Sequence, residues 1–147
     1  MITIFDVNKA VNDTIERAVK GLFSYEIPLI AEELQEPIER PSFKIMIENS
    51  INGKLNYFFQ QKTMTIYLYF FAKNETRSKM ENQKVQNAIE QTLLDGIFIK
   101  EMWFEITEVH ADTTDGILCC SFDLELIEEL EQPQQEEFME ELQTKFY

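Results

Sequence analysis

A strict alternation of apolar and polar residues near the C-terminal end constrains the fold of this chain more than any other feature. Between residues 118 and 126 the polar positions include Ser121, Asp123 and Glu125. Every second residue is apolar: Leu118, Cys120, Phe122, Leu124 and Leu126. Successive side chains of a strand point to opposite faces, so the pattern predicts a strand with one buried and one solvated face. Such a strand is typical of a sheet that helices cover on one side.

Two earlier segments also predict strands. In the first, Phe43, Ile45, Ile47 and Ile51 recur on one face, and Asn52-Gly53 predicts the hairpin turn that follows. In the second, Thr65–Phe71, both faces are apolar. Ile66, Leu68 and Phe70 are expected in the core, whereas Tyr67, Tyr69 and Phe71 face the other way. Either this second face is covered within the subunit or it contacts another subunit, and large exposed rings favour the interface.

The remaining elements complete an α+β domain. A helix is expected over residues 4–22, capped by Thr3 with Asp6 in its first turn. A second helix begins at a capping box, Ser78 to Glu81, and ends before Gly96. Short strands are predicted at 25–30, on a sheet edge because of Pro28, and at 101–109, with a turn over 112–116. The predicted fold is therefore an antiparallel or mixed sheet of four to five strands with two helices on one face.

The last 17 residues predict an acidic amphipathic C-terminal helix. Phe138, Leu142 and Phe146 recur every four residues among Glu136, Glu137, Glu140 and Glu141. We therefore expect a domain over residues 1–130 and an acidic helix or mobile tail over residues 131–147.

Length and composition indicate a single domain. The 147 residues suit one domain, and no apolar run approaches the roughly 20 residues that cross a bilayer. The first residues do not resemble a secretory signal. Cys119 and Cys120 are neighbours that point to opposite faces of a strand, so we expect free thiols in a reducing compartment.

The charge is concentrated near the C-terminal end. The formal net charge is −14, and residues 101–147 carry 14 acidic residues against one base, Lys145. Such a surface repels phosphate backbones and anionic lipid and attracts basic protein surfaces. We therefore expect neither sequence-specific nucleic-acid binding nor membrane binding.

The sequence offers no residue set for catalysis. His110 is the one histidine of the chain, and no paired nucleophile accompanies it. The Asp112–Asp115 turn lacks the rest of a calcium-binding loop, and no phosphate-binding glycine motif is present. The sequence therefore predicts an interaction protein rather than an enzyme, with no catalytic residue, cofactor or metal.

Two groups of residues are the candidate contact sites. The predicted subunit interface comprises the large outward-facing rings, Tyr67, Tyr69, Phe71 and Trp103. The predicted partner-binding site combines carboxylates and apolar residues near the C-terminus: Glu128, Glu129, Glu136, Glu137, Phe138, Leu142 and Phe146.

In the segment from Tyr25 to Ile47, a strand, the acidic pair Glu32-Glu33 and a polar stretch lead into Arg40-Pro41-Ser42-Phe43 and an apolar strand. This layout resembles that of the phage tail terminator family. The chain departs from the family pattern at Pro37 and Lys44, and its acidic C-terminal helix is not part of that pattern. The resemblance implies a structural virion protein that assembles in the bacterial host cytoplasm.

The resemblance also implies partners. Members of the family are expected to form a ring, typically a homohexamer, on the head-proximal end of the tail tube. The ring stops tube polymerisation, contacts head completion or connector proteins and, in a contractile tail, meets the last sheath ring.

A second interpretation is an acidic inhibitor or DNA mimic whose last 47 residues occupy a basic groove. Truncation after Leu130 separates the two, since a mimic would lose its target and a ring former would still assemble. A small hydrolase is a third, minor alternative.

Overall fold

A mixed five-stranded sheet forms the centre of the structure, a computed structural model that describes residues 1–30 and 38–130. The strand order is β1-β2-β3-β7-β6. The strands are β1 (Leu29–Ile30), β2 (Ser42–Lys54), β3 (Phe59–Phe71), β6 (His110–Thr114) and β7 (Ile117–Glu129). β1 runs parallel to β2, and the other neighbours are antiparallel. The predicted mixed sheet is therefore confirmed.

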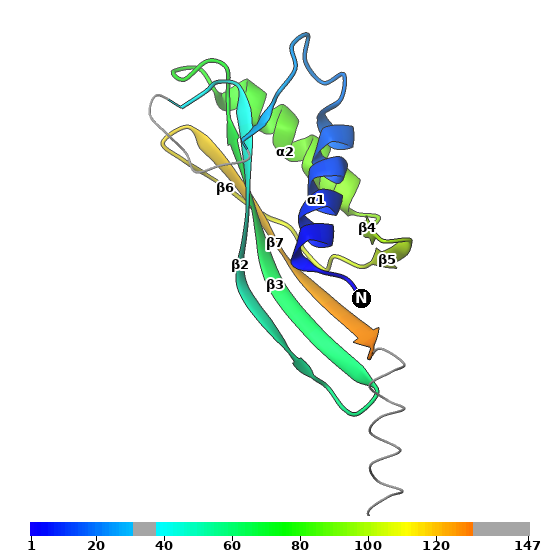
Figure 1. Cartoon of the computed structure of the whole chain (residues 1–147). Helices are drawn as coiled ribbons and strands as arrows, with labels where there is room; N and C mark the ends of the chain where they lie inside the picture. Colours follow the sequence, from blue (N-terminus) through cyan, green and yellow to red (C-terminus); the bar gives the residue numbers. More distant parts are fainter. Residues whose placement is uncertain (31–37, 131–147) are drawn as a thin grey trace, which may run out of the picture.

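Two helices and a small hairpin lie on one side of the sheet. Helices α1 (Ile4–Val19) and α2 (Lys79–Leu93) pack side by side on the same face (Figure 1). The hairpin of β4 (Ile97–Ile99) and β5 (Met102–Phe104) lies on that side as well (Figure 1). The α+β class with two helices on one face is confirmed, whereas the predicted acidic C-terminal helix falls outside the described residues.

The core lies between the helices and the sheet. Its buried side chains come from the inner face of β3, the inner face of β7 and one stripe of each helix. They include Val7, Val11, Ile15, Ile66, Leu68, Phe70, Val85, Ile89, Leu93, Leu118, Cys120, Phe122, Leu124 and Leu126. Burying one large apolar side chain contributes about 1.5–3 kcal/mol, so this face is the main source of stability.

The predicted Thr3 cap of α1 is confirmed, and Asp6 completes it as a capping box. The Thr3 hydroxyl accepts from the Asp6 amide at 3.2 Å, and the Asp6 carboxylate accepts from the Thr3 amide at 2.8 Å. The backbone hydrogen bond from Thr3 is the largest cause that lowers the pKa of Asp6, and Lys100 at 3.2 Å lowers it further. The helix ends at Val19, three residues earlier than predicted.

The predicted capping box of α2 is wrong. Ser78 precedes the helix but makes no capping hydrogen bond through its side chain. The Glu81 carboxylate instead accepts from the Lys73 amide at 2.8 Å and from the Tyr25 hydroxyl at 3.2 Å. Tertiary contacts with the preceding loop and the 20–30 segment therefore replace the local cap.

The predicted hairpin turn at Asn52-Gly53 is also wrong. Both residues belong to β2 and pair with Lys62 and Gln61 of β3. The turn lies at residues 55–58, where the Asn56 side-chain carbonyl accepts from the amides of residues 58 and 59 at 2.8 and 2.9 Å. The Asn56 side chain satisfies these two backbone amides within the turn, so the hairpin closes at residues 55–58.

A β-bulge moves Ile51 to the other face of the sheet. The register of β2 against β3 shifts between Glu48 and Ile51, and Asn49 takes a φ of 55°. One extra residue reverses the alternation, so Ile51 lies opposite Thr63 and is 70% exposed. The prediction that Ile51 shares the face of Phe43 is therefore wrong.

The predicted strand over 101–109 is wrong: within this range only Met102–Phe104 form a strand, β5. Residues 97–104 form the β4–β5 hairpin, and the chain then crosses to β6. Gly96 opens this hairpin with a φ of 84°, and a Cβ there would lie 2.4 Å from the Phe104 carbonyl oxygen. The last turn is Asp115-Gly116, both with positive φ, rather than residues 112–116.

The edge strand predicted at 25–30 is confirmed in position and is shorter. Only Leu29–Ile30 pair with β2, at the edge of the sheet.

Candidate subunit interface

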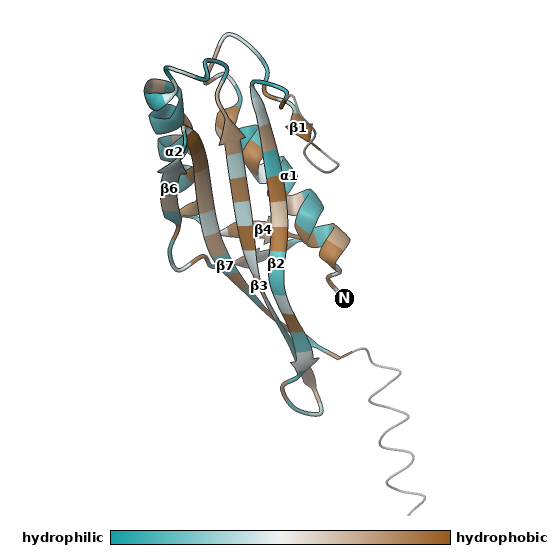
Figure 2. Ribbon diagram, turned by 90° about the vertical axis from the view of Figure 1, so that its left-hand side faces the viewer, coloured by the Kyte–Doolittle hydropathy of each residue, from teal (hydrophilic) through white to brown (hydrophobic). Residues whose placement is uncertain are grey.

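The face of the sheet opposite the helices carries two stacked tyrosines. Tyr67 and Tyr69 of β3 are both half-buried, and their ring centroids are 6.4 Å apart with an interplanar angle of 15°. Met46 lies opposite Tyr67 on β2, and Cys119 lies opposite Tyr69 on β7. We call Met46, Tyr67, Tyr69 and Cys119 the tyrosine patch. Figure 2 shows the sheet from this side, with the helices behind it.

Two side chains of the tyrosine patch, Tyr69 and Cys119, carry no charge near neutral pH. Burial raises the pKa of Tyr69, and contact with Cys119 raises it further. Burial likewise raises the pKa of the Cys119 thiol. Lys44 lies opposite Tyr69 on β2, so a positive charge adjoins these neutral side chains.

The same face becomes polar toward the far end of β7. The Thr65 hydroxyl donates to Asp123 at 2.8 Å, and the Gln61 amide donates to Glu125 at 2.7 Å. An open groove of about 740 Å³ adjoins these pairs and also takes in Glu105. Its carboxylates and hydroxyls can accept hydrogen bonds and attract cationic groups.

Phe71, a predicted interface residue, is covered by its own chain. Its side chain is 2% exposed. The Arg40 guanidinium lies 5.9 Å from the ring centroid and donates to the Ala72 carbonyl oxygen at 3.0 Å. Phe71 therefore offers no surface to a neighbour while Arg40 keeps this position.

Trp103, the fourth predicted residue, lies apart from the tyrosines. It belongs to β5, on the helix side of the sheet (Figure 1). The indole is 62% exposed and packs against Phe98 with ring centroids 5.2 Å apart. The structure thus brings Tyr67 and Tyr69 together but separates both from Trp103.

The sequence matches a family described as "Phage tail terminator protein" over residues 6–137. The chain belongs to the phage tail terminator family. This confirms the resemblance drawn from the 25–47 segment. The family is structural and supplies components of the virion tail. A search of curated proteins finds no match.

Of the acidic residues predicted to bind a partner, two belong to the described part of this family member. Glu128 accepts from the Ile2 amide at 3.0 and 3.2 Å, so its carboxylate holds the N-terminus against β7. Glu129 is exposed and lies opposite Phe59. The other predicted residues, Glu136, Glu137, Phe138, Leu142 and Phe146, lie outside the described residues.

Sequence reasoning missed an apolar surface at the tip of the β2–β3 hairpin. Leu55, Tyr57 and Phe58 are 52%, 65% and 57% exposed. The signal was the aromatic run Tyr57-Phe58-Phe59. Placing the turn at Asn52-Gly53 assigned this run to a returning strand and hid its position at the tip.

His110 and Cys120, two groups with potential reactivity, lie on opposite faces of the sheet, because His110 pairs with Ser121. His110 pairs with Glu108 at 3.0 Å, and both side chains are exposed. Cys120 is buried in the core, and burial raises the pKa of its thiol to about 12. Residues 1–30 and 38–130 contain no group of three His, Cys, Asp or Glu side chains that could hold a metal ion.

Within the same ranges, the helices are too short or too polar to cross a bilayer.

Proposed function

We propose that this chain assembles into a ring, typically of six copies, that caps the head-proximal end of the phage tail tube. The ring stops tube polymerisation and presents a surface to head completion or connector proteins. The observation that carries the proposal is the tyrosine patch, an aromatic surface that the described elements leave half-exposed. Membership of the terminator family supports it.

A closed ring requires two different surfaces on each copy, because a head-to-tail contact joins unlike faces. The tyrosine patch supplies one of them. The hairpin tip of Leu55, Tyr57 and Phe58 and the Phe98–Trp103 pair are exposed apolar surfaces on other parts of the molecule. Either is suited to the opposing side or to the tube protein.

The proposed role is structural, without catalysis. Assembly takes place in the host cytoplasm, and the partners are the tail tube protein, a head completion protein and, in a contractile tail, the sheath. A net charge of −14 repels DNA, so the ring would not retain a passing genome. Weak or undetectable DNA binding at low salt is expected in a gel assay.

The Tyr69→Asp variant tests the proposal. Wild-type protein, alone or with tail tube protein, should reach the molar mass of a ring in light scattering. A charge within the covered patch should prevent assembly, because a carboxylate loses its hydration when a neighbouring copy covers it. The Tyr69→Phe control should still assemble. Rings formed by Tyr69→Asp would show that this face is not the contact, provided that both variants unfold like the wild type.

A further inference from the structure

A basic cluster lies around the start of α2 in this acidic protein. Between residues 73 and 84 there are four bases, Lys73, Arg77, Lys79 and Lys84, and all four are exposed. The two acids in this stretch are Glu75 and Glu81, and the Glu81 carboxylate is occupied by the Lys73 amide and the Tyr25 hydroxyl. Among the described residues, none of the four basic side chains has an ion-pair partner.

Two of these cations are held in place by aromatic rings. The Lys73 ammonium lies 4.7 Å from the Tyr25 ring centroid, and the Lys84 ammonium lies 5.8 Å from that of Phe23. The two rings stack at 5.1 Å. Cation–π contacts of this kind restrain the lysines, so a bound anionic partner would order them at a smaller entropic cost.

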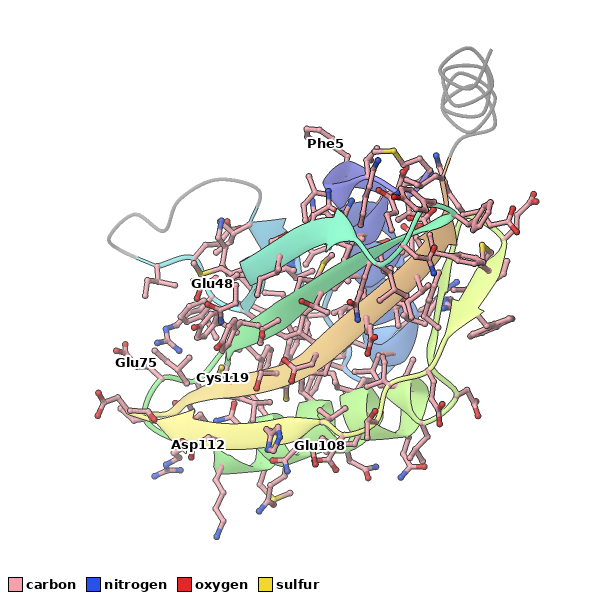
Figure 3. The ribbon with its side chains drawn as sticks, turned by 90° about the horizontal axis from the view of Figure 1, so that it is seen from below. Phe5, Glu48, Glu75, Glu108, Asp112 and Cys119 are labelled. Atoms are coloured by element: carbon pink, nitrogen blue, oxygen red, sulfur yellow. The ribbon has the colours of Figure 1, made fainter. Side chains whose placement is uncertain are left out.

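The cluster also contains an exposed apolar side chain. Met80 is 68% exposed and lies one helical turn before Lys84. The β6–β7 hairpin adjoins the cluster, since a Cβ on Gly116 would lie 3.6 Å from the Glu75 carbonyl oxygen. This hairpin carries Asp112, labelled in Figure 3, and Asp115. The cluster therefore suits a short acidic segment that also carries apolar residues.

The chain itself contains such a segment beyond its described part. Residues 131–147 carry five acids and one base, with Phe138, Leu142 and Phe146 at intervals of four. The family match ends at residue 137, so this apolar repeat lies beyond the shared region. We propose that the basic cluster of one copy binds residues 131–147 of a second copy.

The point where the chain leaves the domain indicates that residues 131–147 bind the basic cluster of a second copy rather than that of their own copy. The Leu130 amide donates to the Phe58 carbonyl oxygen at 2.7 Å, so the chain leaves the domain at the β2–β3 hairpin tip. The basic cluster lies beside the opposite end of β7, where the Asn82 side-chain amide donates to the Gly116 carbonyl oxygen at 3.0 Å. Figure 1 shows the end of β7 and the start of α2 at opposite ends of the sheet.

The length of β7 gives the distance between the basic cluster and the point where the chain leaves the domain. The 13 residues of β7 span about 40 Å at roughly 3.3 Å per residue. Phe138 follows Leu130 by eight residues, and eight fully extended residues span at most about 29 Å. Phe138 therefore cannot reach the basic cluster of its own copy. Donor and acceptor at opposite ends suit a head-to-tail contact between copies.

This inference rests on the proposed self-association, because copies must meet, and it names the two surfaces that meet. Full-length protein with photoreactive benzoylphenylalanine in place of Phe138 tests it. Copies labelled with ¹⁴N and ¹⁵N are mixed, irradiated and digested for mass spectrometry. Mixed-isotope cross-links to peptides that contain residues 77–84 are expected. Cross-links within one copy, or to other parts of the domain, would overturn the proposal.

Charge exchange provides the matched control. Lys79→Glu combined with Lys84→Glu should lower the mixed cross-link yield by about tenfold or more, because attraction becomes repulsion. Glu137→Lys combined with Glu141→Lys in the photoreactive copy should restore it. Lys9→Glu combined with Arg17→Glu on α1 makes the same charge change elsewhere and should leave the yield unchanged. An unchanged yield in the α2 variant would contradict the inference.

The molar mass of the same samples separates the two proposals. Oligomers without mixed cross-links to α2 would overturn this inference and leave the proposed ring intact. A sample that stays monomeric with tube protein present would overturn both.

Discussion

The two faces of β3 differ sharply although they belong to one strand. Ile66, Leu68 and Phe70 on the inner face are at most 1% exposed, whereas Tyr67 and Tyr69 on the outer face are half-buried. Both faces have similar apolar content. The difference arises because α1 and α2 cover one face and no described element covers the tyrosines. One strand can therefore supply the core with one set of residues and a contact surface with the other.

The outer face is itself divided. Arg40 covers Phe71, the tyrosine patch remains accessible, and the Thr65–Asp123 pair is polar. The apolar pattern of a strand therefore does not state which rings are available to a partner. Side chains from outside the strand decide that.

The largest expected effect comes from the inner face. Leu68→Ala should lower the free energy of unfolding by about 2–5 kcal/mol, because it leaves a cavity in the core. Tyr67→Ala, one residue away on the outer face, should cost clearly less in the monomer. Urea denaturation of both variants at low protein concentration measures the two values. Equal losses would break the distinction between the faces.

The two adjacent thiols allow a second comparison. Burial raises the pKa of Cys120 to about 12, above its ordinary value of 9.0. Since the folded state favours the protonated thiol, this contribution to stability is complete below about pH 9 and is lost as the pH rises toward about 12. Cys120→Ala should therefore flatten the alkaline fall in unfolding free energy. Cys119→Ala, on the outer face, should flatten it less.

Urea titrations of both variants between pH 8 and 11 under reducing conditions measure which substitution flattens the fall in unfolding free energy more. The reverse order would mean that the outer thiol is the better shielded of the two.

The smallest expected effect concerns the cover over Phe71. Arg40→Ala removes the cation–π contact and the hydrogen bond to Ala72, together worth about 1–2 kcal/mol. It should also expose the Phe71 ring next to the tyrosine patch and increase self-association. Denaturation and light scattering measure the two effects. Unchanged stability would show that Arg40 does not hold the ring.

Local patterns predicted much of the fold. The alternation in residues 118–126 identified the inner face of β7, and Thr3 with Asp6 identified the start of α1. These predictions succeed because they depend on neighbours in the sequence. The start of α2 at Ser78 was predicted correctly, but its capping box failed because Glu81 bonds to Tyr25, 56 residues away, instead of capping its own helix.

The candidate site was predictable in part. The outward direction of Tyr67 and Tyr69 followed from the strand period. The cover over Phe71 depends on Arg40, and the apolar hairpin tip depends on where the turn closes. The bulge at Asn49 reversed the face of Ile51, and no periodic pattern contains that information.

The sequence by itself determined which residues of each strand share a face, because side-chain alternation is a local property of extended backbone. Family membership was also readable from it, over residues 6–137. Only the tertiary structure decided which faces are closed, since the covering groups, α1, α2 and Arg40, come from distant parts of the chain. It also placed the basic cluster and the exit of the chain at opposite ends of β7, because a strand of 13 residues separates them.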